Sequence, residues 1–253
     1  MPHARPKGDV VRLKRKTDPG GSARGSADRG AGDTEHFFDR YDRFLDTSET
    51  GPWLERLNAR YMALIHANRD LIRDATVLDL GSHDGRFSFA ALYNGAAHVI
   101  GLEHKPRLVA KSKTNLTELE IAPERFDFRE GDMFERLDEI DHRDVVFCFG
   151  VFYHITDHMR LLRKLASLQP DWIIFDTNVS RGKKPIIELR PEGMAPNVLV
   201  GWPNTAGLDM MVANLGWTIE YFDWDASGLL SGSKLSDYAT GRRVTAVVSC
   251  SNT

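Results

Sequence analysis

The sequence predicts an α/β fold, a doubly wound and mostly parallel sheet of seven strands with helices on both faces. Three observations predict it. Short apolar runs typical of buried strands alternate with stretches of helical periodicity along most of the 253-residue chain. A glycine-containing turn at residues 81–85 follows the first of these runs and leads into a helical stretch. Prolines stand where helices should begin or end, as at Pro106 and Pro170. Such alternation builds parallel strands joined by right-handed crossover helices.

Strands and helices can be placed one by one from residue 76 onward. The expected strands share apolar and β-branched residues and cover 76–81, 98–103, 125–130, 144–149, 172–176, 217–223 and 244–250. The expected helices share apolar residues three or four positions apart and cover 86–93, 107–119, 157–167 and 205–215, with a short turn at 133–137. Residues 33–75 precede them as two helices separated by Gly51 and Pro52. We therefore expect one domain at 76–253, preceded by N-terminal helices.

Two segments of that domain, 177–204 and 225–241, show neither pattern. The first combines several prolines with Gly, Lys, Arg and Asn, and it is too long for a plain connection. Loops at the carboxyl edge of a parallel sheet often carry substrate contacts. We expect both segments to be loops that act as a lid or a wall of a ligand pocket.

The first 32 residues differ in composition from the rest of the chain. They hold eight basic side chains against three acidic ones, a surplus of +5, which leaves −8 on the remaining residues of a chain with net charge −3. The segment is rich in Gly and Ser and has no apolar periodicity, so it cannot bury enough surface to offset its ordering entropy. We expect a disordered basic arm at 1–32; a contact with nucleic acid or acidic lipid is the functional alternative.

Composition also limits the compartment and the chemistry. No apolar run approaches the roughly 20 residues of a membrane span, and the N-terminus has no apolar segment typical of a secretory signal. The two cysteines, Cys148 and Cys250, lie in apolar runs without zinc-ligand spacing, so we expect buried free thiols. These observations predict a cytoplasmic protein with no membrane partner and no metal site.

Carboxylates and glycines stand at the ends of the first three expected strands. Asp79 precedes the turn that contains Gly81 and Gly85; glycines let the backbone press against a ligand, and the following helix start offers free N–H groups. Glu103 ends the second strand, where a carboxylate can bind both ribose hydroxyls of an adenosine. Asp132 follows the third strand, where an acid can accept a hydrogen bond from an adenine amino group. The sequence therefore predicts a site for an adenosine-containing cofactor.

A nicotinamide dinucleotide is one alternative for that site. Its G-x-G-x-x-G fingerprint requires glycine where this chain has His83 and Arg86. The sequence therefore disfavours a Rossmann oxidoreductase.

Taken together, the three strand ends resemble the cofactor-binding motifs of class I S-adenosylmethionine-dependent methyltransferases, a Rossmann-like family. The resemblance runs from about residue 76 to 176 and implies S-adenosylmethionine as the cofactor. It implies that Asp79, Gly81 and Gly85 form the first motif, with Glu103 on the ribose and Asp132 on the adenine. Further cofactor contacts implied around these motifs come from Ser82, His83, Met133 and Phe149. His83 departs from the family's D-x-G-x-G-x-G, whose middle glycine it replaces.

The reacting group should lie beside the end of the fourth strand, next to the switch point of the sheet. His154 is a candidate general base toward a hydroxyl or an amine, with Asp157 or a carbonyl fixing its tautomer. The alternative is a structural histidine that bonds the next helix. Tyr153 is a second catalytic candidate and also a candidate for binding the acceptor. Asn178, after the fifth strand, is expected to contact the acceptor as well.

The stretch 150–154 is similar to the G-V-L-Y-H of the tRNA wobble-uridine carboxymethyltransferases. In this resemblance Tyr153 and Arg243 match residues that those enzymes aim at the extra carboxylate of a carboxylated cofactor. The alternative is that Arg242 and Arg243 flank an exposed turn. The acidic body also lacks the broad basic face that a tRNA binder needs. We therefore expect ordinary S-adenosylmethionine, with Arg243 either facing solvent or contacting an acidic acceptor.

These features predict a methyltransferase that acts on an oxygen or nitrogen of a small-molecule acceptor, with 177–204 and 225–241 shaping the acceptor pocket. One alternative is a tRNA-modifying methyl- or carboxymethyltransferase that uses the basic arm. Another is a non-catalytic cofactor-binding partner subunit, against which the joint presence of Asp79, Glu103 and Asp132 argues. Methyl transfer needs little besides alignment, because the sulfonium is already a strong electrophile.

Overall fold

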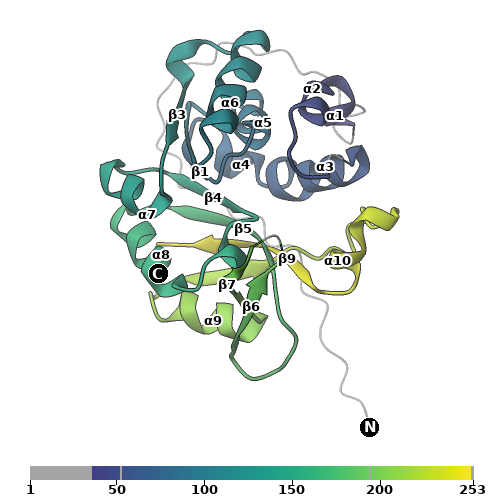
Figure 1. Cartoon of the computed structure of the whole chain (residues 1–253), viewed down its shortest axis with the longest axis vertical. Coiled ribbons are helices and arrows are strands. Elements are labelled where there is room, and N and C mark those ends of the chain that lie inside the picture. The colour runs from purple at the N-terminus through teal and green to yellow at the C-terminus, as the bar shows by residue number, and fades with distance from the viewer. Residues whose placement is uncertain (1–35, 52, 194, 252–253) are drawn as a thin grey trace, which may run out of the picture. The chain divides into compact units, whose positions relative to one another are not determined.

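A seven-stranded sheet forms the centre of the protein in the computed structural model, which describes residues 36–51, 53–193 and 195–251 (Figure 1). The strands follow the order β3-β2-β1-β4-β5-β9-β8. Their bounds are β1 (Thr76–Leu80), β2 (His98–Glu103), β3 (Phe126–Glu130), β4 (Val145–Phe149), β5 (Trp172–Asn178), β8 (Thr218–Tyr221) and β9 (Arg243–Ser249). The first five pair in parallel, and β9 runs antiparallel to both of its neighbours, β5 and β8. The doubly wound, mostly parallel α/β fold predicted from the sequence is confirmed.

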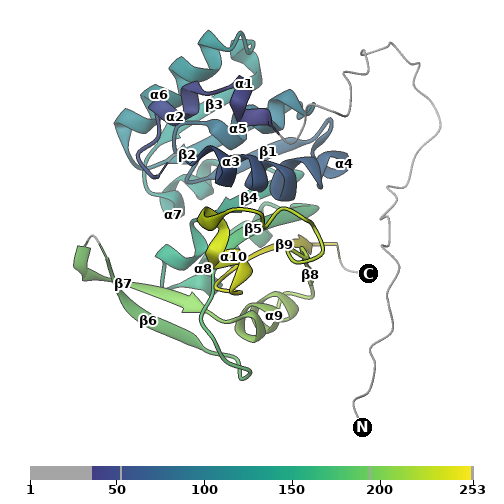
Figure 2. The ribbon, with the colours of Figure 1, turned by 90° about the vertical axis from the view of Figure 1, so that its right-hand side faces the viewer.

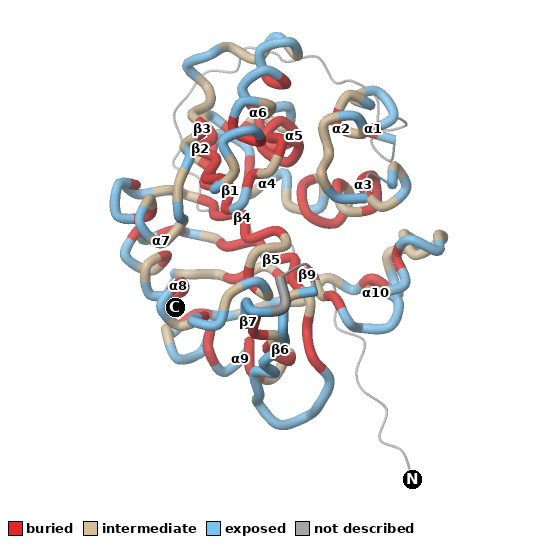
Figure 3. The backbone as a smooth tube through the Cα atoms, viewed as in Figure 1, coloured by how far each residue is buried: buried red, intermediate tan, exposed pale blue. Residues whose placement is uncertain are grey.

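Helices cover both faces of this sheet (Figures 1 and 2). One face packs against α1 (Phe37–Arg40), α2 (Arg43–Asp46), α3 (Leu54–Tyr61), α4 (Arg69–Ile72), α5 (Arg86–Tyr93) and α6 (Pro106–Glu118). The other packs against α7 (Met133–Arg136), α8 (His158–Ser167) and α9 (Thr205–Ala213). Side chains alternate between the faces along each strand, as the pleat requires: Val145 and Phe147 join the first core, Val146 and Cys148 the second. Buried residues accordingly concentrate in the central strands (Figure 3).

The N-terminal helices are shorter than the periodicity predicts. The first expected helix is two four-residue helices, α1 and α2, and the second is α3 followed by a π-helical turn at Met62–His66 and by α4. Aromatic packing holds the short helices in place: Phe37 stacks on Tyr61 with ring centroids 4.1 Å apart, and Phe38 is fully buried. These short helices are therefore stabilised by tertiary packing rather than by the longer helical runs that the sequence indicated.

Residues 187–203 of the segment 177–204 form a β-hairpin, so the prediction of a loop was wrong for this part, while 179–186 contain no helix or strand. Strands β6 (Ile187–Glu192) and β7 (Ala195–Pro203) form a separate two-stranded antiparallel sheet (Figure 2). Each strand of such a pair has one edge without hydrogen-bond partners, so prolines are tolerated there. The hairpin is anchored at Gly201, whose N–H donates to the Ile155 carbonyl (2.9 Å) and whose carbonyl lies 3.0 Å from His158 Nε2. A Cβ at Gly201 would stand 2.7 Å from the His158 ring, so glycine is needed there.

The second expected loop, 225–241, is partly helical. It contains a 3-10 turn at Ser233–Leu235 and the short helix α10 (Ser236–Ala239). Trp224, Leu235 and Tyr238 pack against Ala59 and Ala63 of the N-terminal helices. The segment therefore packs against α3 and the π-helical turn that follows it.

Other expectations concern the arm, the cysteines and the membrane. The arm at 1–32 lies outside the described residues. Cys148 is a buried free thiol and Cys250 is a half-buried one. In the part of the chain that the structure describes, no helix has the length and apolar character needed to cross a lipid bilayer.

Candidate functional site

The turn after β1 has the backbone geometry that its glycines predict. Gly81 and Gly85 adopt φ values of 62° and 80°, in the left-handed region that disfavours side chains. A Cβ at Gly81 would lie 2.7 Å from the Val151 side chain. Gly85 then directly precedes α5. Gly81 is exposed at the carboxyl edge of β1, where a ligand can approach the backbone, whereas Gly85 is buried against Leu116 and Ser112 of α6.

His83 occupies the position where the resembled motif has its middle glycine. The backbone conformation at this position is one that glycine adopts readily and other residues disfavour. Its φ is 55°, a left-handed conformation that costs a non-glycine residue energy. The imidazole lies beside both Asp84 (Nδ1 to Oδ1, 3.3 Å) and Arg86 (Nδ1 to Nη2, 3.2 Å). Its Nε2 lies 3.4 Å from the Glu49 backbone nitrogen. Polar contacts on both ring nitrogens therefore accompany the strained backbone of His83.

Two polar side chains at this turn are buried. Asp79 is 2% exposed and accepts a 2.6 Å hydrogen bond from the Ser88 hydroxyl. Burial raises the pKa of Asp79 to about 7, with the charges of Glu103 and Asp84 acting in the same direction. The hydroxyl of Ser82 is buried with no hydrogen-bond partner among the described residues. An unpaired buried hydroxyl is costly, so a ligand atom that bonds it is stabilised there.

Glu103 ends β2 beside that turn. Its carboxylate accepts hydrogen bonds from the backbone N–H groups of His83 (3.1 Å) and Lys105 (3.0 Å), and the residue is 6% exposed. A carboxylate offers about four acceptor positions, so positions remain for ribose hydroxyls. The structure thus brings Glu103 and the glycine turn together, as the sequence suggested.

The expected adenine contacts, Asp132 and Met133, follow β3, and Phe149, a further expected cofactor contact, ends β4. Asp132 caps α7 by accepting a 2.8 Å hydrogen bond from the Phe134 backbone N–H, and Met133 is half-buried behind it. Phe149 ends β4, nearly buried, with its ring 5.3 Å from Phe87. The cap uses one oxygen of Asp132, and a carboxylate can accept further hydrogen bonds at the other.

The residues around the turn fit the cofactor that the resemblance implies. The fit rests on the left-handed Gly81 and Gly85, on the unpaired hydroxyl of Ser82 and on the carboxylate of Glu103. These groups lie at the carboxyl ends of β1 and β2, which are neighbours in the sheet. They are the residues that would hold an adenosine-containing cofactor with an amino-acid tail.

Tyr153 and His154 follow β4 in a 3-10 turn (Phe152–His154) and line a cavity of about 140 Å³. Nδ1 of His154 lies 3.3 Å from Oε1 of Glu192, at the end of β6. Asp157 instead caps α8 by accepting a hydrogen bond from the Arg160 N–H (3.2 Å), so the prediction that Asp157 orients His154 was wrong. Because Glu192 faces Nδ1, it favours the tautomer that leaves the Nε2 lone pair open.

Partial burial lowers the pKa of His154, whose side chain is 46% exposed, below its ordinary value. The Glu192 carboxylate acts in the opposite direction, and the positive charge of Arg243 adds to the lowering. The net effect favours the neutral imidazole at neutral pH. A neutral imidazole oriented by a carboxylate is the arrangement of a general base.

Arg243 is buried, which corrects the expectation that it faces solvent. It is 7% exposed and pairs with the fully buried Asp176 through Nε (2.9 Å) and Nη2 (3.0 Å). Nη1 donates to Oδ1 of Asn178 (3.3 Å), and the guanidinium lies 5.6 Å from the ring centroid of Tyr153. The cause is β-sheet register: Arg243 begins β9 opposite Asn178, next to the buried carboxylate of Asp176. Arg242, one residue earlier, is exposed.

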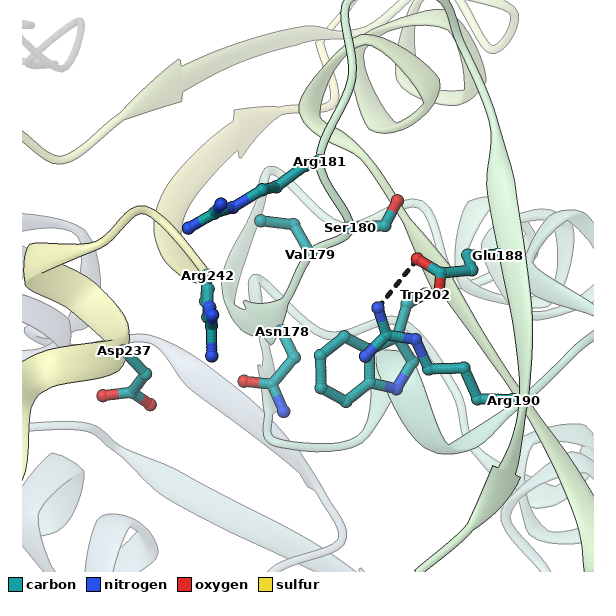
Figure 4. A pocket seen from close by; sticks show the side chains of 9 residues that line it. All are labelled: Asn178, Val179, Ser180, Arg181, Glu188, Arg190, Trp202, Asp237 and Arg242. Carbon is teal, nitrogen blue, oxygen red and sulfur yellow. Dashed lines mark hydrogen bonds and ion pairs between the residues drawn. The ribbon is translucent and has the colours of Figure 1, made fainter.

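A larger cavity of about 580 Å³ adjoins this arrangement (Figure 4). Its lining comes from the end of β5 and the following segment, the hairpin and the segment before β9: Asn178, Val179, Ser180, Arg181, Glu188, Arg190, Trp202, Asp237 and Arg242. Trp202 and Arg190 line both cavities. Of the predicted acceptor residues, Asn178 lies in the larger cavity and Tyr153 in the smaller one.

Sequence reasoning missed the hairpin residues of this site, Glu192, Arg190 and Trp202. The signal that could have found them is the run Val198–Trp202, whose β-branched and aromatic residues have high strand propensity. The prolines on either side obscure this signal, because prolines are typical of loops.

Comparison with known proteins agrees with this geometry. Residues 72–183 match the protein family described as "Methyltransferase domain". A tRNA U34 carboxymethyltransferase of Helicobacter pylori (strain HPAG1) is 27% identical, in an alignment that covers 56% of this chain and 59% of that protein. The chain thus spans less than two thirds of the length of this relative.

Solved structures share the fold at low sequence identity. An S-adenosylmethionine-dependent methyltransferase from Mesorhizobium loti has a TM-score of 0.57 at 15% identity, covering 76% of this chain and 97% of that one. The N-terminal domain of EvdMO1, crystallised with SAH and D-fucose, has a TM-score of 0.57 at 20% identity, covering 87% and 98%. The DhpI-SAM-HEP complex has a TM-score of 0.52 at 16% identity, covering 87% and 99%. Residues 72–183 are therefore similar to a methyltransferase domain, and the chain has the fold of the S-adenosylmethionine-dependent methyltransferases.

Proposed function

We propose that the chain transfers a methyl group from S-adenosylmethionine to an oxygen or nitrogen atom of a small-molecule acceptor. The cofactor supplies an electrophilic methyl group on its sulfonium. The residues proposed to hold it are the turn 81–85, with the Ser82 hydroxyl, and Glu103. Support comes from the family match over 72–183 and from fold neighbours whose structures contain SAM or SAH.

The observation that carries the acceptor chemistry is the pair formed by His154 and Glu192. The carboxylate lies against Nδ1, and partial burial lowers the pKa of the imidazole, so Nε2 of the neutral form can take a proton. The pair lines a cavity after β4, on the side of the sheet edge where β1 and β4 are neighbours. In the proposed reaction Nε2 of His154 would take the proton of the acceptor's hydroxyl or amine. The bound cofactor would supply the methyl group to that atom and leave as S-adenosylhomocysteine.

A small acceptor is favoured by the hairpin. Trp202, Arg190 and Glu192 wall the cavities beside Tyr153, and the combined space suits a molecule of metabolite size. The body outside residues 1–32 carries a charge of −8, which disfavours a long contact with nucleic acid.

A tRNA-modifying activity is the second candidate. It is favoured by the 27% identity to the Helicobacter pylori tRNA U34 carboxymethyltransferase and by the basic composition of residues 1–32. The third reading, a non-catalytic cofactor-binding subunit, has no support from the oriented His154, which cofactor binding alone does not need.

The test is formation of S-adenosylhomocysteine by the full chain with S-adenosylmethionine and either a panel of hydroxy and amino compounds or unmodified tRNA. We expect turnover with members of the small-molecule panel and none with tRNA. His154→Ala should lower kcat by about 10²–10⁴-fold, the usual contribution of a general base. His142→Ala is the control, because His142 is exposed and precedes the amino end of β4. Turnover confined to tRNA, or a His154→Ala variant with full kcat, would contradict the proposal.

A further inference from the structure

The larger cavity has an unbalanced charge. Of its charged lining residues, Glu188 is paired with Arg190 (2.7 Å). Asp237 is paired with Arg56 through two hydrogen bonds of 2.7 and 2.6 Å. Both carboxylates of the lining are therefore neutralised by a partner. The guanidinium groups that remain give the cavity a net positive charge.

The unpaired cations are Arg181 and Arg242. No carboxylate of the described residues lies within 4.0 Å of either guanidinium. They come from two distant parts of the chain, the segment after β5 and the segment before β9, and both face the same cavity (Figure 4). Two like charges held together without a counterion repel each other, so an anion between them is stabilised.

The segment that carries Arg181 is fixed rather than loose. Asn204 holds it by donating to the carbonyls of Gly182 (3.0 Å) and Lys184 (2.6 Å) and by accepting from the Ile186 N–H (3.2 Å). The Ser180 N–H also donates to the Pro203 carbonyl. Because the backbone on this side is held by the hairpin, less conformational entropy is lost when Arg181 binds a ligand.

A second, independent observation concerns two buried donors in the wall. Ser180 is 6% exposed, and its hydroxyl has no hydrogen-bond partner in the described part of the chain. Nε of Arg190 is also buried and has no hydrogen-bond partner among the described residues. The guanidinium of Arg190 lies 4.2 Å from the ring centroid of Trp202. Buried donors without acceptors are rare, because each costs free energy. Both lack what an anionic ligand supplies, an acceptor oxygen.

We propose that the larger cavity binds an anionic group of the acceptor, a carboxylate or a phosphate, between Arg181 and Arg242. This inference rests on the proposed function and names its substrate class: a small molecule with an anion at one end and a hydroxyl or amine at the other. Arg190 and Trp202 line both cavities, so one molecule can place its anion in the larger cavity and its nucleophile at His154. Guanidinium groups suit this role because they bind planar oxyanions through two parallel hydrogen bonds.

Binding can be tested without turnover. Saturation-transfer NMR on the full chain compares benzoate and phenyl phosphate with benzamide, a neutral molecule of the same size as benzoate. We expect benzoate and phenyl phosphate to bind at least about tenfold more tightly than benzamide. The variant with both Arg181→Gln and Arg242→Gln should lose that preference and keep its affinity for S-adenosylmethionine. Arg163→Gln, an exposed arginine of α8 outside both cavities, should change neither. The ratio of benzoate to phenyl phosphate distinguishes a carboxylate site from a phosphate site.

Equal binding of benzoate and benzamide, or a preference that survives the double substitution, would overturn the inference. So would a double variant that loses affinity for tRNA and keeps it for benzoate, since the arginines would then contact nucleic acid. Failure of the proposed function looks different: the chain would bind benzoate through Arg181 and Arg242 but neither bind S-adenosylmethionine nor form S-adenosylhomocysteine.

Discussion

Asp176 is the residue on which the buried charges of this protein converge. Its carboxylate is fully buried and accepts hydrogen bonds from Arg60, Arg243 and the Tyr238 hydroxyl. The two guanidinium groups hold the pKa of Asp176 well below its ordinary value, against the effect of burial. Since α3, β5, α10 and β9 each contribute one of these side chains, the cluster fixes the acceptor side of the sheet.

This pairing bears on the choice of cofactor. A guanidinium near a positive sulfonium is favourable only if a carboxylate lies between them, and Asp176 already supplies that carboxylate to Arg243. We predict that competition binding shows no preference for a carboxylated S-adenosylmethionine over the ordinary form. A preference of tenfold or more, about 1.4 kcal/mol, that disappears in Arg243→Ala would contradict this prediction.

Asp79 predicts a pH dependence of stability. Its pKa is raised to about 7 in the folded protein, above its ordinary value of 3.8, so the folded state binds more protons between these pH values. The stability that Asp79 contributes is complete below about pH 4 and is lost as the pH rises toward 7. Asp79→Asn should therefore gain stability relative to the wild type with rising pH, with a slope of at most about 1.4 kcal/mol per pH unit.

Urea denaturation at pH 5 and pH 8 measures that difference. Asp171→Asn is the control, because its exposed side chain lies just before β5. A stability difference between Asp79→Asn and the wild type that is the same at both pH values would show that Asp79 is not desolvated as the structure indicates.

At the level of elements, the β6–β7 hairpin completes the acceptor side. It brings Glu192 to His154 and places Trp202 between the two cavities. The anchor at Gly201 leaves no room for a side chain, which fixes the hairpin against α8. We therefore propose that Glu192 acts as a positioning residue through His154.

Glu192→Gln tests that role through the pH profile of activity. The base is active when unprotonated, so activity falls as the pH drops through the pKa of His154. Glu192 raises that pKa, so its loss should move the acid limb of the kcat/KM profile to lower pH and should lower kcat through loss of orientation. Asp157→Asn should leave the limb in place, because asparagine caps α8 equally well. If Asp157→Asn shifts the acid limb and Glu192→Gln does not, Asp157 rather than Glu192 orients His154.

The elements also show where sequence reasoning succeeds. The boundaries of β1, α5 and β2 were predicted to within one residue, because these buried strands and their connections have unambiguous periodicity. The hairpin was missed, since its prolines indicate a loop unless the strand is known to be at an edge. The same contrast applies to the site residues. Glu103 can be predicted from its place at the end of a strand, whereas the contact of Glu192 with His154 forms only in the tertiary fold.

For the whole molecule, the sheet separates two tasks. The residues proposed to bind the cofactor lie at the ends of β1, β2 and β3, and those proposed to bind the acceptor follow β4 and β5 or precede β9. The two groups meet where β1 and β4 pair. Their arrangement follows from strand order, which explains why strand-end residues were predictable while the residues after β5 were not.

We predict that the basic arm, residues 1–32, is dispensable for folding and for binding S-adenosylmethionine. Its composition cannot build a core, so deleting residues 1–32 should leave Tm and affinity for S-adenosylmethionine unchanged. A longer deletion, 1–46, also removes the buried side chains of Phe37, Phe38 and Phe44 and should lower Tm sharply. If the shorter deletion flattens the salt dependence of tRNA binding, residues 1–32 contact the tRNA backbone, which would support a tRNA-modifying activity. A large loss of Tm in the shorter deletion would show that the arm packs on the body.

The most direct test is calorimetric titration of the full chain with S-adenosylmethionine, for the wild type and for Glu103→Ala. We predict binding at one site, weakened by about 1–3 kcal/mol in Glu103→Ala because the ribose hydroxyls of the cofactor lose their proposed acceptor. Glu220→Gln, an exposed carboxylate on β8, should bind like the wild type. A wild-type chain that does not bind S-adenosylmethionine, or a folded Glu103→Ala variant with unchanged affinity, would contradict the account.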